Sequence, residues 1–300
     1  MPSRHYALRP PTGYRVDYEI NPWMDRAVQP NSARANAEWT ALVAALRQLG
    51  AAVDIVDGAP SLPDAVFLTD CGFVANRTYI PASFRFGARS RETVGTLTWM
   101  ESRGFHVLRP PHKPGVYLEG GDIRVFGDRL VGGYGWRSSM AGLSMLCELT
   151  GLDLLPVRLT DARYFHLDMT FCALDDRSAL MIPAAWDSRS RRALFSDVHN
   201  PIVLTEDEAL AFSANAIVIG TNVVMHSCSE RLRRLLETNG FHPVVTPAGE
   251  FIKAGGGVSC MAMPLDSILR FRRRLQHRPR AAARERATRP PRLSLPLTLQ

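Results

Sequence analysis

The sequence repeats one structural pattern five times, and this repetition restricts the possible folds more than any other feature. In each copy a helical run ends in Gly or Asn and leads into an apolar strand, with the caps at Gly50, Gly104, Gly151, Asn200 and Gly240. Gly or Asn directly after a helix is typical of the left-handed cap that ends it. The period is roughly 40–54 residues, which is the range expected for stacked structural repeats.

A second element, a pair of strands around a tight turn, lies between these helices. Four copies are predicted, at residues 72–82, 122–133, 169–183 and 216–226, with Gly, Asp and Asn concentrated in the turns. Residues 258–265 supply at least part of a fifth pair. A serine often follows and is expected to cap the next helix, as Ser138 or Ser139, Ser188, and Ser227 or Ser229 would.

Units of this kind cannot bury an apolar face alone, so they must stack on their neighbours. We therefore predict an α/β fold in which five β-hairpin–α–β units form a closed ring. The helix near residues 33–49 would follow the C-terminal strand pair in space and so close the ring. The ring forms one domain, residues 1–268. The alternative is a doubly wound sheet produced by ordinary alternation of strands and helices.

Composition narrows the setting of this domain. Hydrophobic residues make up 46% of the 300 residues, which is enough for a sizeable core. No window approaches 18 apolar residues, so neither a signal peptide nor a membrane span is predicted. The five cysteines are odd in number and form no CxxC pair, which favours reduced thiols and a cytoplasmic protein.

The basic charge of the chain is concentrated at one end. Residues 270–300 contain ten arginines and one glutamate, a charge of +9, so the rest of the chain carries +7 − 9 = −2. Residues 269–300 are also rich in Ala and Pro and lack apolar periodicity after about residue 276. We predict a disordered tail, interpreted as a solvated extension rather than as a nucleic-acid-binding segment.

Chemically informative residues occupy one position in every unit. Asp70, Asp122, Asp168, Asn215 and Gly257 each stand just before the first strand of a pair. In a ring, this shared register would point the side chains at a common centre. A single acid on a loop would be an ordinary solvated carboxylate, so the register is what gives these acids their interest.

Reactive groups cluster around the same positions. Glu119 precedes a glycine pair, His166 stands two residues before Asp168, and Cys260 follows three glycines in what is expected to be a strand. Cys, His and Glu are the groups needed to activate a thiol and to supply a general acid or base. Two alternatives remain open, namely a buried structural cysteine and a zinc site formed by His166, Asp168 and Cys260, although no short-range metal-ligand spacing is present.

Several segments together resemble the guanidino-group-modifying enzymes. They are Phe67-Leu-Thr-Asp70, Glu119-Gly-Gly-Asp122, Gly133-Tyr-Gly-Trp-Arg137-Ser, His166-Leu-Asp168 and Gly255-Gly-Gly-Val-Ser-Cys260. The resemblance extends from the Asn21-Pro22-Trp23-Met24 segment to about Pro264. It implies the pentein fold, a five-bladed α/β propeller, which agrees with the fivefold pattern.

The same resemblance implies a role for each matching residue. It assigns Cys260 as nucleophile, His166 as general acid and base, and Glu119 as the acid that orients or polarises. Substrate-binding residues would be Asp64, Asp70 and Asp168 around the guanidinium, Arg85 and Arg137 on the substrate carboxylate, and Asn21. Arg89 and Arg91 are close alternatives to Arg85. No cofactor is implied, and the expected partner is a small guanidino molecule, neither membrane nor nucleic acid, with a homodimer left open.

Over its whole length the sequence is most similar to the dimethylarginine dimethylaminohydrolase-like branch. This resemblance implies conversion of Nω,Nω-dimethylarginine to citrulline and dimethylamine through a covalent thiouronium intermediate. Thr69 departs from that branch, which often has Glu there, and this leaves the substrate open. Arginine dihydrolases typically have Asn where this chain has Asp70, and EGAGD where it has EGGD. Both differences separate this chain from the dihydrolases. Arginine deiminase or dihydrolase activity is the alternative, followed by an amidinotransferase and a non-catalytic pentein binding module.

Overall fold

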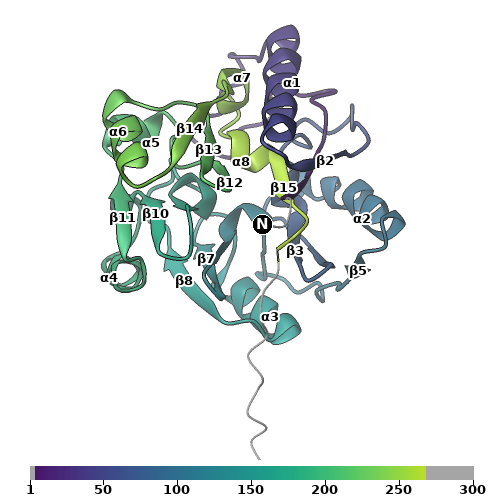
Figure 1. Cartoon of the computed structure of the whole chain (residues 1–300). Coiled ribbons are helices and arrows are strands. Elements are labelled where there is room, and N and C mark those ends of the chain that lie inside the picture. The colour runs from purple at the N-terminus through teal and green to yellow at the C-terminus, as the bar shows by residue number, and fades with distance from the viewer. Residues whose placement is uncertain (1–3, 268–300) are drawn as a thin grey trace, which may run out of the picture.

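Five small sheets surround a common centre in the part of the chain that the computed structural model describes, residues 4–267 (Figure 1). Each sheet has three strands, and the inner strand pairs antiparallel with a middle strand that pairs parallel with an outer one. The inner strands are Gly72–Ala75 (β3), Ile123–Phe126 (β6), Phe171–Ala173 (β9), Ile217–Ile219 (β12) and Ala262–Pro264 (β15). The predicted α/β ring of five units is confirmed.

The other ten strands repeat this order around the ring. The middle strands are Thr78–Pro81 (β4), Arg129–Tyr134 (β7), Ser178–Met181 (β10), Asn222–Met225 (β13) and His5–Leu8 (β1). The outer strands are His106–Val107 (β5), Leu154–Arg158 (β8), Asn200–Val203 (β11), His242–Val245 (β14) and Ala52–Ile55 (β2).

The two ends of the described chain together build the fifth sheet. β1 pairs antiparallel with β15, with Tyr6 opposite Pro264, and parallel with β2, with Tyr6 opposite Val53. This pairing closes the ring. The sequence pattern anticipates β15 but not β1, because the strand at the N-terminus has no helix or turn signal before it.

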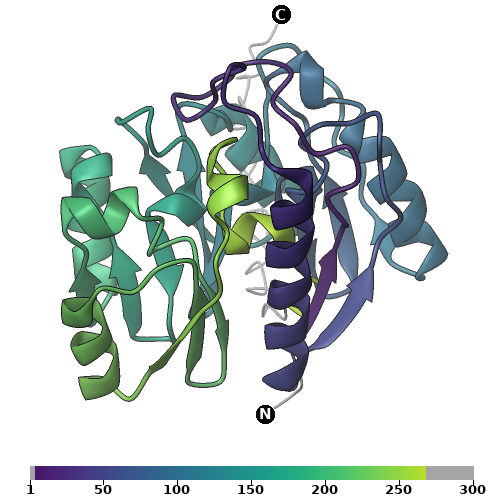
Figure 2. The same cartoon turned by 90° about the horizontal axis from the view of Figure 1, so that it is seen from above.

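Helices cover the outside of the ring (Figures 1 and 2). The helix that links the middle and outer strands of each sheet is Ser32–Gln48 (α1), Glu92–Ser102 (α2), Met140–Thr150 (α3), Ser188–Asp197 (α4) or Glu230–Thr238 (α6). Shorter helices are Glu206–Leu210 (α5), Gly249–Ile252 (α7) and Val258–Met261 (α8). Single 3-10 turns are Leu68–Cys71 (η1), Gly87–Arg89 (η2), Gly120–Asp122 (η3), Leu167–Met169 (η4) and Pro183–Ala185 (η5).

Most of the predicted helix ends are confirmed. Gly50, Gly104, Gly151 and Gly240 all have positive φ, between 68° and 85°, as a left-handed cap requires. Asn200 was expected to do the same, and this is wrong. The helix α4 already ends at Asp197, and Asn200 begins the strand β11.

Serine caps two of the three helices for which the sequence predicts it. The hydroxyl of Ser139 accepts a hydrogen bond from the Gly142 N–H at the start of α3, and Ser229 caps α6 in the same way. The prediction for Ser188 is wrong, because the preceding residue, Asp187, accepts the bond from the Ser190 N–H. A carboxylate one residue earlier reaches the free N–H group as well as a serine would.

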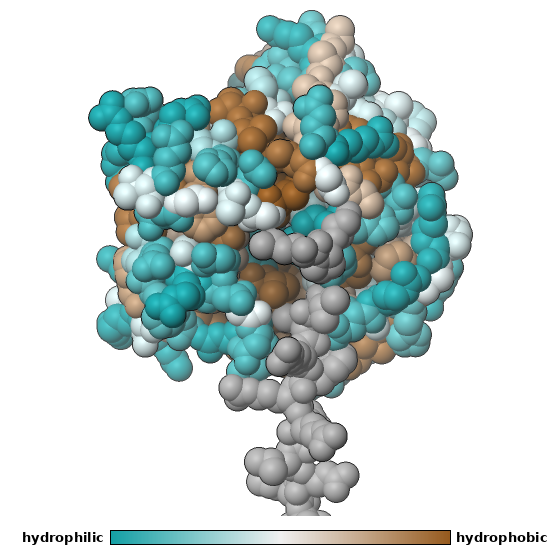
Figure 3. All heavy atoms as spheres, in the orientation of Figure 1, coloured by the Kyte–Doolittle hydropathy of each residue, from teal (hydrophilic) through white to brown (hydrophobic). Residues whose placement is uncertain are grey.

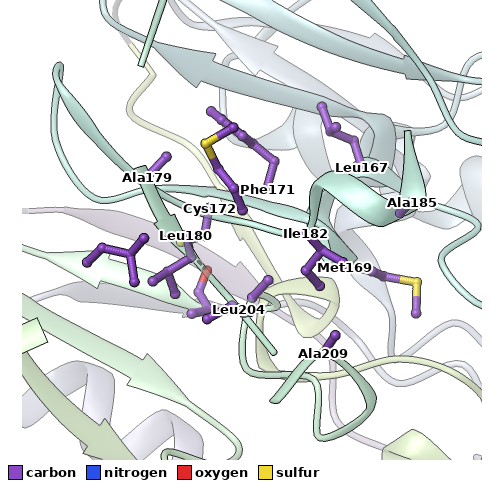
Figure 4. Close-up of a cluster of buried hydrophobic side chains, with 14 of the residues drawn as sticks. Leu167, Met169, Phe171, Cys172, Ala179, Leu180, Ile182, Ala185, Leu204 and Ala209 are labelled. Atoms are coloured by element: carbon purple, nitrogen blue, oxygen red, sulfur yellow. Dashed lines mark hydrogen bonds between the residues drawn. The ribbon is translucent and has the colours of Figure 1, made fainter. Parts of the chain in front are cut away.

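The hydrophobic core lies between the sheets and the helices, and it continues from one blade to the next. Figure 4 shows part of the largest cluster, where Phe171 and Cys172 of β9 and Leu180 of β10 pack near Leu204. Complete burial of an apolar side chain of this size stabilises the folded protein by about 1.5–3 kcal/mol relative to leaving it exposed. On the face of Figure 3, hydrophilic residues dominate the periphery and more hydrophobic surface lies toward the middle.

Two expectations about the C-terminal part need correction or fall outside the structure. The Gly255–Cys260 run was predicted to be a strand, but Cys260 lies in the helical turn α8, and the strand β15 begins only at Ala262. The tail predicted for residues 269–300 lies outside the described residues. Among residues 4–267, no helix has the length and apolar character needed to cross a bilayer.

Candidate active site

The turns that precede the inner strands meet at the centre of the ring. Asp122 accepts hydrogen bonds from the backbone N–H groups of Ser138 and Leu167, at 2.9 and 3.1 Å. Asn215 accepts a bond of 2.9 Å from the Ser259 N–H. These bonds tie together the turns of different blades, so the structure brings together the five positions that share a register in the sequence.

Cys260 is buried at this centre, at the third position of α8. Its Sγ lies 3.3 Å from Asp168 Oδ2 and accepts a hydrogen bond of 3.2 Å from the Asn215 side-chain amide. Burial and the nearby carboxylates of Asp168 and Asp70 raise the pKa of the thiol well above its usual value. Cys260 is therefore a neutral thiol while the site holds no cation.

His166 is fully buried between two carboxylates. Its Nε2 lies 2.9 Å from Glu119 Oε2, and its Nδ1 lies 3.4 Å from Asp70 Oδ1. Burial alone would lower the pKa of His166, but Asp70, Glu119 and Asp122 outweigh it and raise the pKa to about 9. The imidazole is therefore protonated at neutral pH.

Glu119 is held as an anion by its partners. Burial would raise its pKa, but the Arg137 guanidinium and His166 lower it to about 2. Arg137 Nη1 lies 3.3 Å from Glu119 Oε2. Asp122, in contrast, is buried without a contacting guanidinium, and burial raises its pKa to about 6 against the effects of His166 and Ser138.

Three buried carboxylates each keep one oxygen without a hydrogen-bond partner. Asp64 uses Oδ2 to accept from the Tyr18 hydroxyl, Asp70 uses Oδ2 for Arg89 at 2.7 Å, and Asp168 uses Oδ2 for Arg124 at 2.7 Å. The Oδ1 atom of each has no hydrogen-bond partner, and neither does His166 Nδ1, whose 3.4 Å contact with Asp70 Oδ1 is an ion pair without a hydrogen bond. Buried polar atoms are normally hydrogen-bonded, so this set marks a site prepared for a ligand rich in N–H donors.

A hollow lined by two of these carboxylates, Asp64 and Asp70, lies beside Cys260, and we call it the front pocket. Its polar lining contains Asn21, Asp64, Asp70, Arg89 and Arg137, with Cys260 at its wall. The apolar lining comes from Met24, Phe67, Phe165, Ala254, Gly255 and Gly256.

Two of the glycines before Cys260 have distinct reasons to be glycine. Gly255 has a φ of 82°, which a residue with a side chain rarely adopts. At Gly256 a Cβ atom would overlap the Phe67 ring. Both glycines line the front pocket, so the absence of side chains keeps its wall low beside the sulfur.

The predicted carboxylate clamp at Arg85 does not lie in this pocket. The Arg85 side chain is exposed and donates to the Gly135 carbonyl, while its backbone N–H donates to Glu119 Oε1. Its alternative, Arg89, is buried and lines the pocket, and it is bound by Glu92, Asp70 and Asp64. The short turn η2 places Arg89, rather than Arg85, toward the centre, which spacing in the sequence does not reveal.

Two residues at the centre were not singled out from the sequence for what they do. The sequence pattern gives Asn215 only its position in the shared register, but its amide donates to both Cys260 Sγ and the Asp168 carbonyl. The pattern predicts Arg124 within a strand pair, and the structure adds its direct contact with Asp168. The only signal for Arg124 was a cation two residues after Asp122, inside a strand.

Residues 4–267 contain no group of three His, Cys, Asp or Glu side chains arranged to hold a metal ion. The acids and the histidine at the centre are instead paired with arginines and with one another. Chemically, the arrangement offers a thiol, a protonated imidazole held by a carboxylate, and three carboxylates able to receive a planar cation.

Comparisons with known proteins place this arrangement among enzymes that act on arginine derivatives. A family profile described as N,N dimethylarginine dimethylhydrolase, eukaryotic, matches residues 14–267. The dimethylarginine dimethylaminohydrolase of Mycobacterium tuberculosis is 32% identical over 263 residues, which is 88% of this chain and 86% of that protein.

The bifunctional arginine dihydrolase/ornithine cyclodeaminase AgrE of a Nostoc species is 33% identical over 90% of this chain. The match spans only 39% of the length of AgrE. A solved N-terminal domain of ArgZ, described as a cyanobacterial arginine dihydrolase, has a TM-score of 0.84 at 30% identity and covers 89% of this chain and 99% of that one. A dimethylarginine dimethylaminohydrolase structure has a TM-score of 0.71 at 24% identity, over 88% of this chain and all of that one, a likeness of fold.

Proposed function

Because this chain belongs to the dimethylarginine dimethylaminohydrolase family, and so is a hydrolase that acts on carbon–nitrogen bonds in linear amidines, we propose that it hydrolyses the guanidinium group of a free arginine derivative. The leading substrate is Nω,Nω-dimethylarginine, with citrulline and dimethylamine as products. The observation that carries the proposal is a set of three buried carboxylate oxygens without a hydrogen-bond partner, on Asp168 in contact with the Cys260 thiol and on Asp64 and Asp70 in the pocket that Cys260 also lines.

A guanidinium relieves this arrangement better than other small cations. It is planar and carries several N–H donors, so it can bond to more than one carboxylate at once. Dimethylation of one nitrogen still leaves three N–H groups for the three free oxygens. Held in this way, the guanidinium carbon faces Cys260 Sγ, and the fixed orientation lowers the barrier to attack.

The substrate's charge activates the thiol. In the empty site, burial and the carboxylates of Asp168 and Asp70 keep Cys260 protonated. A cation bound between those carboxylates offsets their charge and lowers the pKa of the thiol, so that its proton leaves to solvent. Attack of the thiolate on the cationic carbon then gives a neutral tetrahedral adduct, which needs no oxyanion hole.

His166 then handles two protons in turn. As an imidazolium, with its pKa raised to about 9, it gives a proton to the departing nitrogen, so that a neutral amine leaves and a cationic thiouronium remains on Cys260. The neutral imidazole next takes a proton from water as the water oxygen adds to the thiouronium carbon. Loss of the Cys260 thiol leaves the urea group of citrulline and restores the enzyme. Glu119 holds the ring throughout, through its 2.9 Å contact.

The amino-acid end of the substrate meets the arginine side of the pocket. We place its carboxylate near Arg137 and Arg89, with Asn21 beside them, because these residues line the front pocket and Arg85 does not. Arg137 is fixed by stacking on Phe165 and Phe86, with its guanidinium carbon 4.4 and 5.1 Å from the ring centroids.

Arginine is the second candidate, with citrulline and ammonia, or ornithine after a second hydrolysis, as products. Two observations favour it. The likeness to the arginine dihydrolase domain is closer, with a TM-score of 0.84 against 0.71. The Thr69 hydroxyl donates to the Ser259 carbonyl at 2.7 Å, so no further carboxylate stands at this position for a methylated substrate.

The purified protein should be incubated separately with dimethylarginine and with arginine, and citrulline, dimethylamine, ammonia and ornithine should be measured. We expect citrulline and dimethylamine from dimethylarginine, and no product from Cys260→Ser. Cys147→Ser, a half-buried thiol in α3, is the matched control and should keep full activity. Ornithine as the main product would identify a dihydrolase, and no turnover of either substrate by the wild-type protein would contradict the proposal.

A further inference from the structure

The centre of the ring carries a second hollow, which we call the rear hollow. It is lined by residues of all five inner strands, and its charged lining residues within the described chain are Arg4 and Arg124. It shares no lining residue with the front pocket. Arg124 therefore contacts Asp168 from a hollow that is distinct from the front pocket.

Arg124 is anchored to three blades at once. Its Nη1 donates to the carbonyls of Gly120 and Ile123, at 3.3 and 2.6 Å. Its Nη2 donates to Ser259 Oγ at 3.1 Å and lies 2.7 Å from Asp168 Oδ2. The side chain is only 16% exposed, and Asp168 is completely buried.

We propose that Arg124 is a positioning residue, which holds Asp168 ionised and leaves its second oxygen free for the substrate guanidinium. The inference rests on the proposed function and extends it to a residue that does not touch the substrate. Arg124 contacts Oδ2 of Asp168, and Oδ1 of the same carboxylate is the oxygen without a hydrogen-bond partner. A carboxylate fixed in this way presents a defined acceptor to the cation.

The groups around Asp168 make such a partner necessary. Cys260 Sγ faces it from α8 at 3.3 Å, and Asp70 and His166 act on it from η1 and from the start of η4. Burial raises the pKa of Asp168 above its usual value, and Arg124 is the strongest influence that lowers it, followed by His166. Without Arg124, a buried carboxylate beside a neutral thiol would tend to hold a proton, and a protonated Asp168 binds a guanidinium poorly.

The sign of the pH effect follows directly. Loss of Arg124 moves the ionisation of Asp168 to higher pH, so the acid limb of kcat/KM, which reports groups of the free enzyme, should move upward. Below both pKa values, a shift of one unit lowers the ionised fraction tenfold. Arg124→Met should therefore lose more kcat/KM at the acid end of the profile than at the alkaline end, relative to wild type, by about tenfold for each unit by which the limb moves.

The experiment measures kcat/KM with the substrate that wild type turns over, from pH 5.5 to 9.5. It compares wild type with Arg124→Met, Arg124→Lys and Arg231→Met. Arg231 is the matched control, since it pairs with the buried acid Glu208 at 2.7 Å in a different part of the ring. We expect Arg124→Lys to recover part of the activity at pH 6, and Arg231→Met to leave the pH profile unchanged.

A double variant tests whether Arg124 acts through Asp168. In an Asp168→Asn background the acid that Arg124 would hold is gone, so adding Arg124→Met should change kcat/KM less than threefold. An unshifted acid limb in Arg124→Met, or the same loss in both backgrounds, would overturn the inference while wild-type turnover still stands. If Arg124→Met does not fold, the acid limb of Arg124→Lys is measured instead. An upward shift of that limb supports the inference, and an unshifted limb overturns it. No turnover by wild type would instead contradict the proposed function.

Discussion

The front pocket and the rear hollow lie on two sides of the same few residues and differ in their chemistry. The front pocket combines the acids Asp64 and Asp70 with Arg89 and Arg137. The rear hollow has the two arginines Arg4 and Arg124, together with hydroxyl and apolar groups, and no carboxylate among its described lining residues. Of the two hollows, the front pocket is therefore the one with carboxylates among its described lining residues.

Consecutive residues divide between the two sides. Thr69 lines the rear hollow and Asp70 the front pocket, and likewise Ser259 lies at the rear while Cys260 faces the front. Each pair lies in its own short helical turn, η1 for Thr69 and Asp70 and α8 for Ser259 and Cys260. In such a turn, successive side chains point about 100–120° apart. Short turns at the strand starts, rather than the strands themselves, therefore decide which side chains line the front pocket.

The largest contrast is expected at the front, at His166. His166→Gln removes the group that protonates the departing amine, and general acid–base catalysis of this kind contributes about 10²–10⁴-fold. We expect kcat to fall about thousandfold, measured as citrulline formed at saturating substrate. His226→Gln is the control, since its ring accepts a bond from the Ala248 N–H outside the site and should cost little. Equal losses in both variants would remove His166 from the mechanism.

The neighbouring pair Thr69 and Asp70 gives the sharpest test of the front-and-rear division. Asp70→Asn removes a charged acceptor beside the substrate, which is expected to cost about 2–3 kcal/mol, or roughly 30–150-fold in kcat/KM. Thr69→Val removes only a neutral bond to the Ser259 carbonyl at the rear, about 0.5–1.5 kcal/mol. At the midpoints of these two ranges, steady-state kinetics should separate the kcat/KM losses of the two variants by about tenfold, and equal losses would contradict the division between front and rear.

A smaller effect is expected when Glu119 is replaced, as a shift in the alkaline limb of the kcat/KM profile. His166 must be protonated in the first step, so activity should be lost as the pH rises through about 9. Glu119→Gln removes one of the charges that raise the pKa of His166, so this limb should move to lower pH, by about one unit. The measurement is kcat/KM between pH 7 and 10. A limb that stays near pH 9 would show that another group controls it.

The smallest effect is expected at Arg85, on the rim. Its exposed side chain reaches the Gly135 carbonyl and does not line the front pocket. Arg85→Ala should therefore change KM by less than about threefold, since exposed contacts contribute little. Arg89→Ala should raise KM far more, because Arg89 lines the pocket. A reversal of this order in steady-state assays would restore Arg85 as the clamp.

The ring could be predicted from sequence because its signals are local and repeated. Glycine caps such as Gly104 and turn residues such as Gly127 depend on positive φ, which few other residues tolerate. The strand β1 could not be predicted, since four residues at the N-terminus carry no flanking signal and pair only with distant segments. Cys260 was expected in a strand because Val258–Met261 is short and apolar, a pattern that periodicity cannot distinguish from a helical turn.

The site was predicted in its residue types more than in its geometry. The shared register placed acids such as Asp70 and Asp168 near one centre, because the turns repeat. The direction of each side chain depends on single turns, so Arg85 could not be distinguished from Arg89. The role of Arg124 depends on a contact with Asp168 across two blades, 44 positions apart in the sequence, and no local pattern encodes it.

If the front pocket brings a guanidinium carbon to the sulfur of Cys260, a covalent intermediate forms on this residue during turnover. It can be detected by mass spectrometry of the protein, quenched with acid during turnover of dimethylarginine and then digested. We expect an adduct with the mass of the substrate less dimethylamine on the peptide that contains Cys260, absent in Cys260→Ser and retained in Cys147→Ser. Continued turnover by Cys260→Ser, or an adduct on another cysteine, would contradict it.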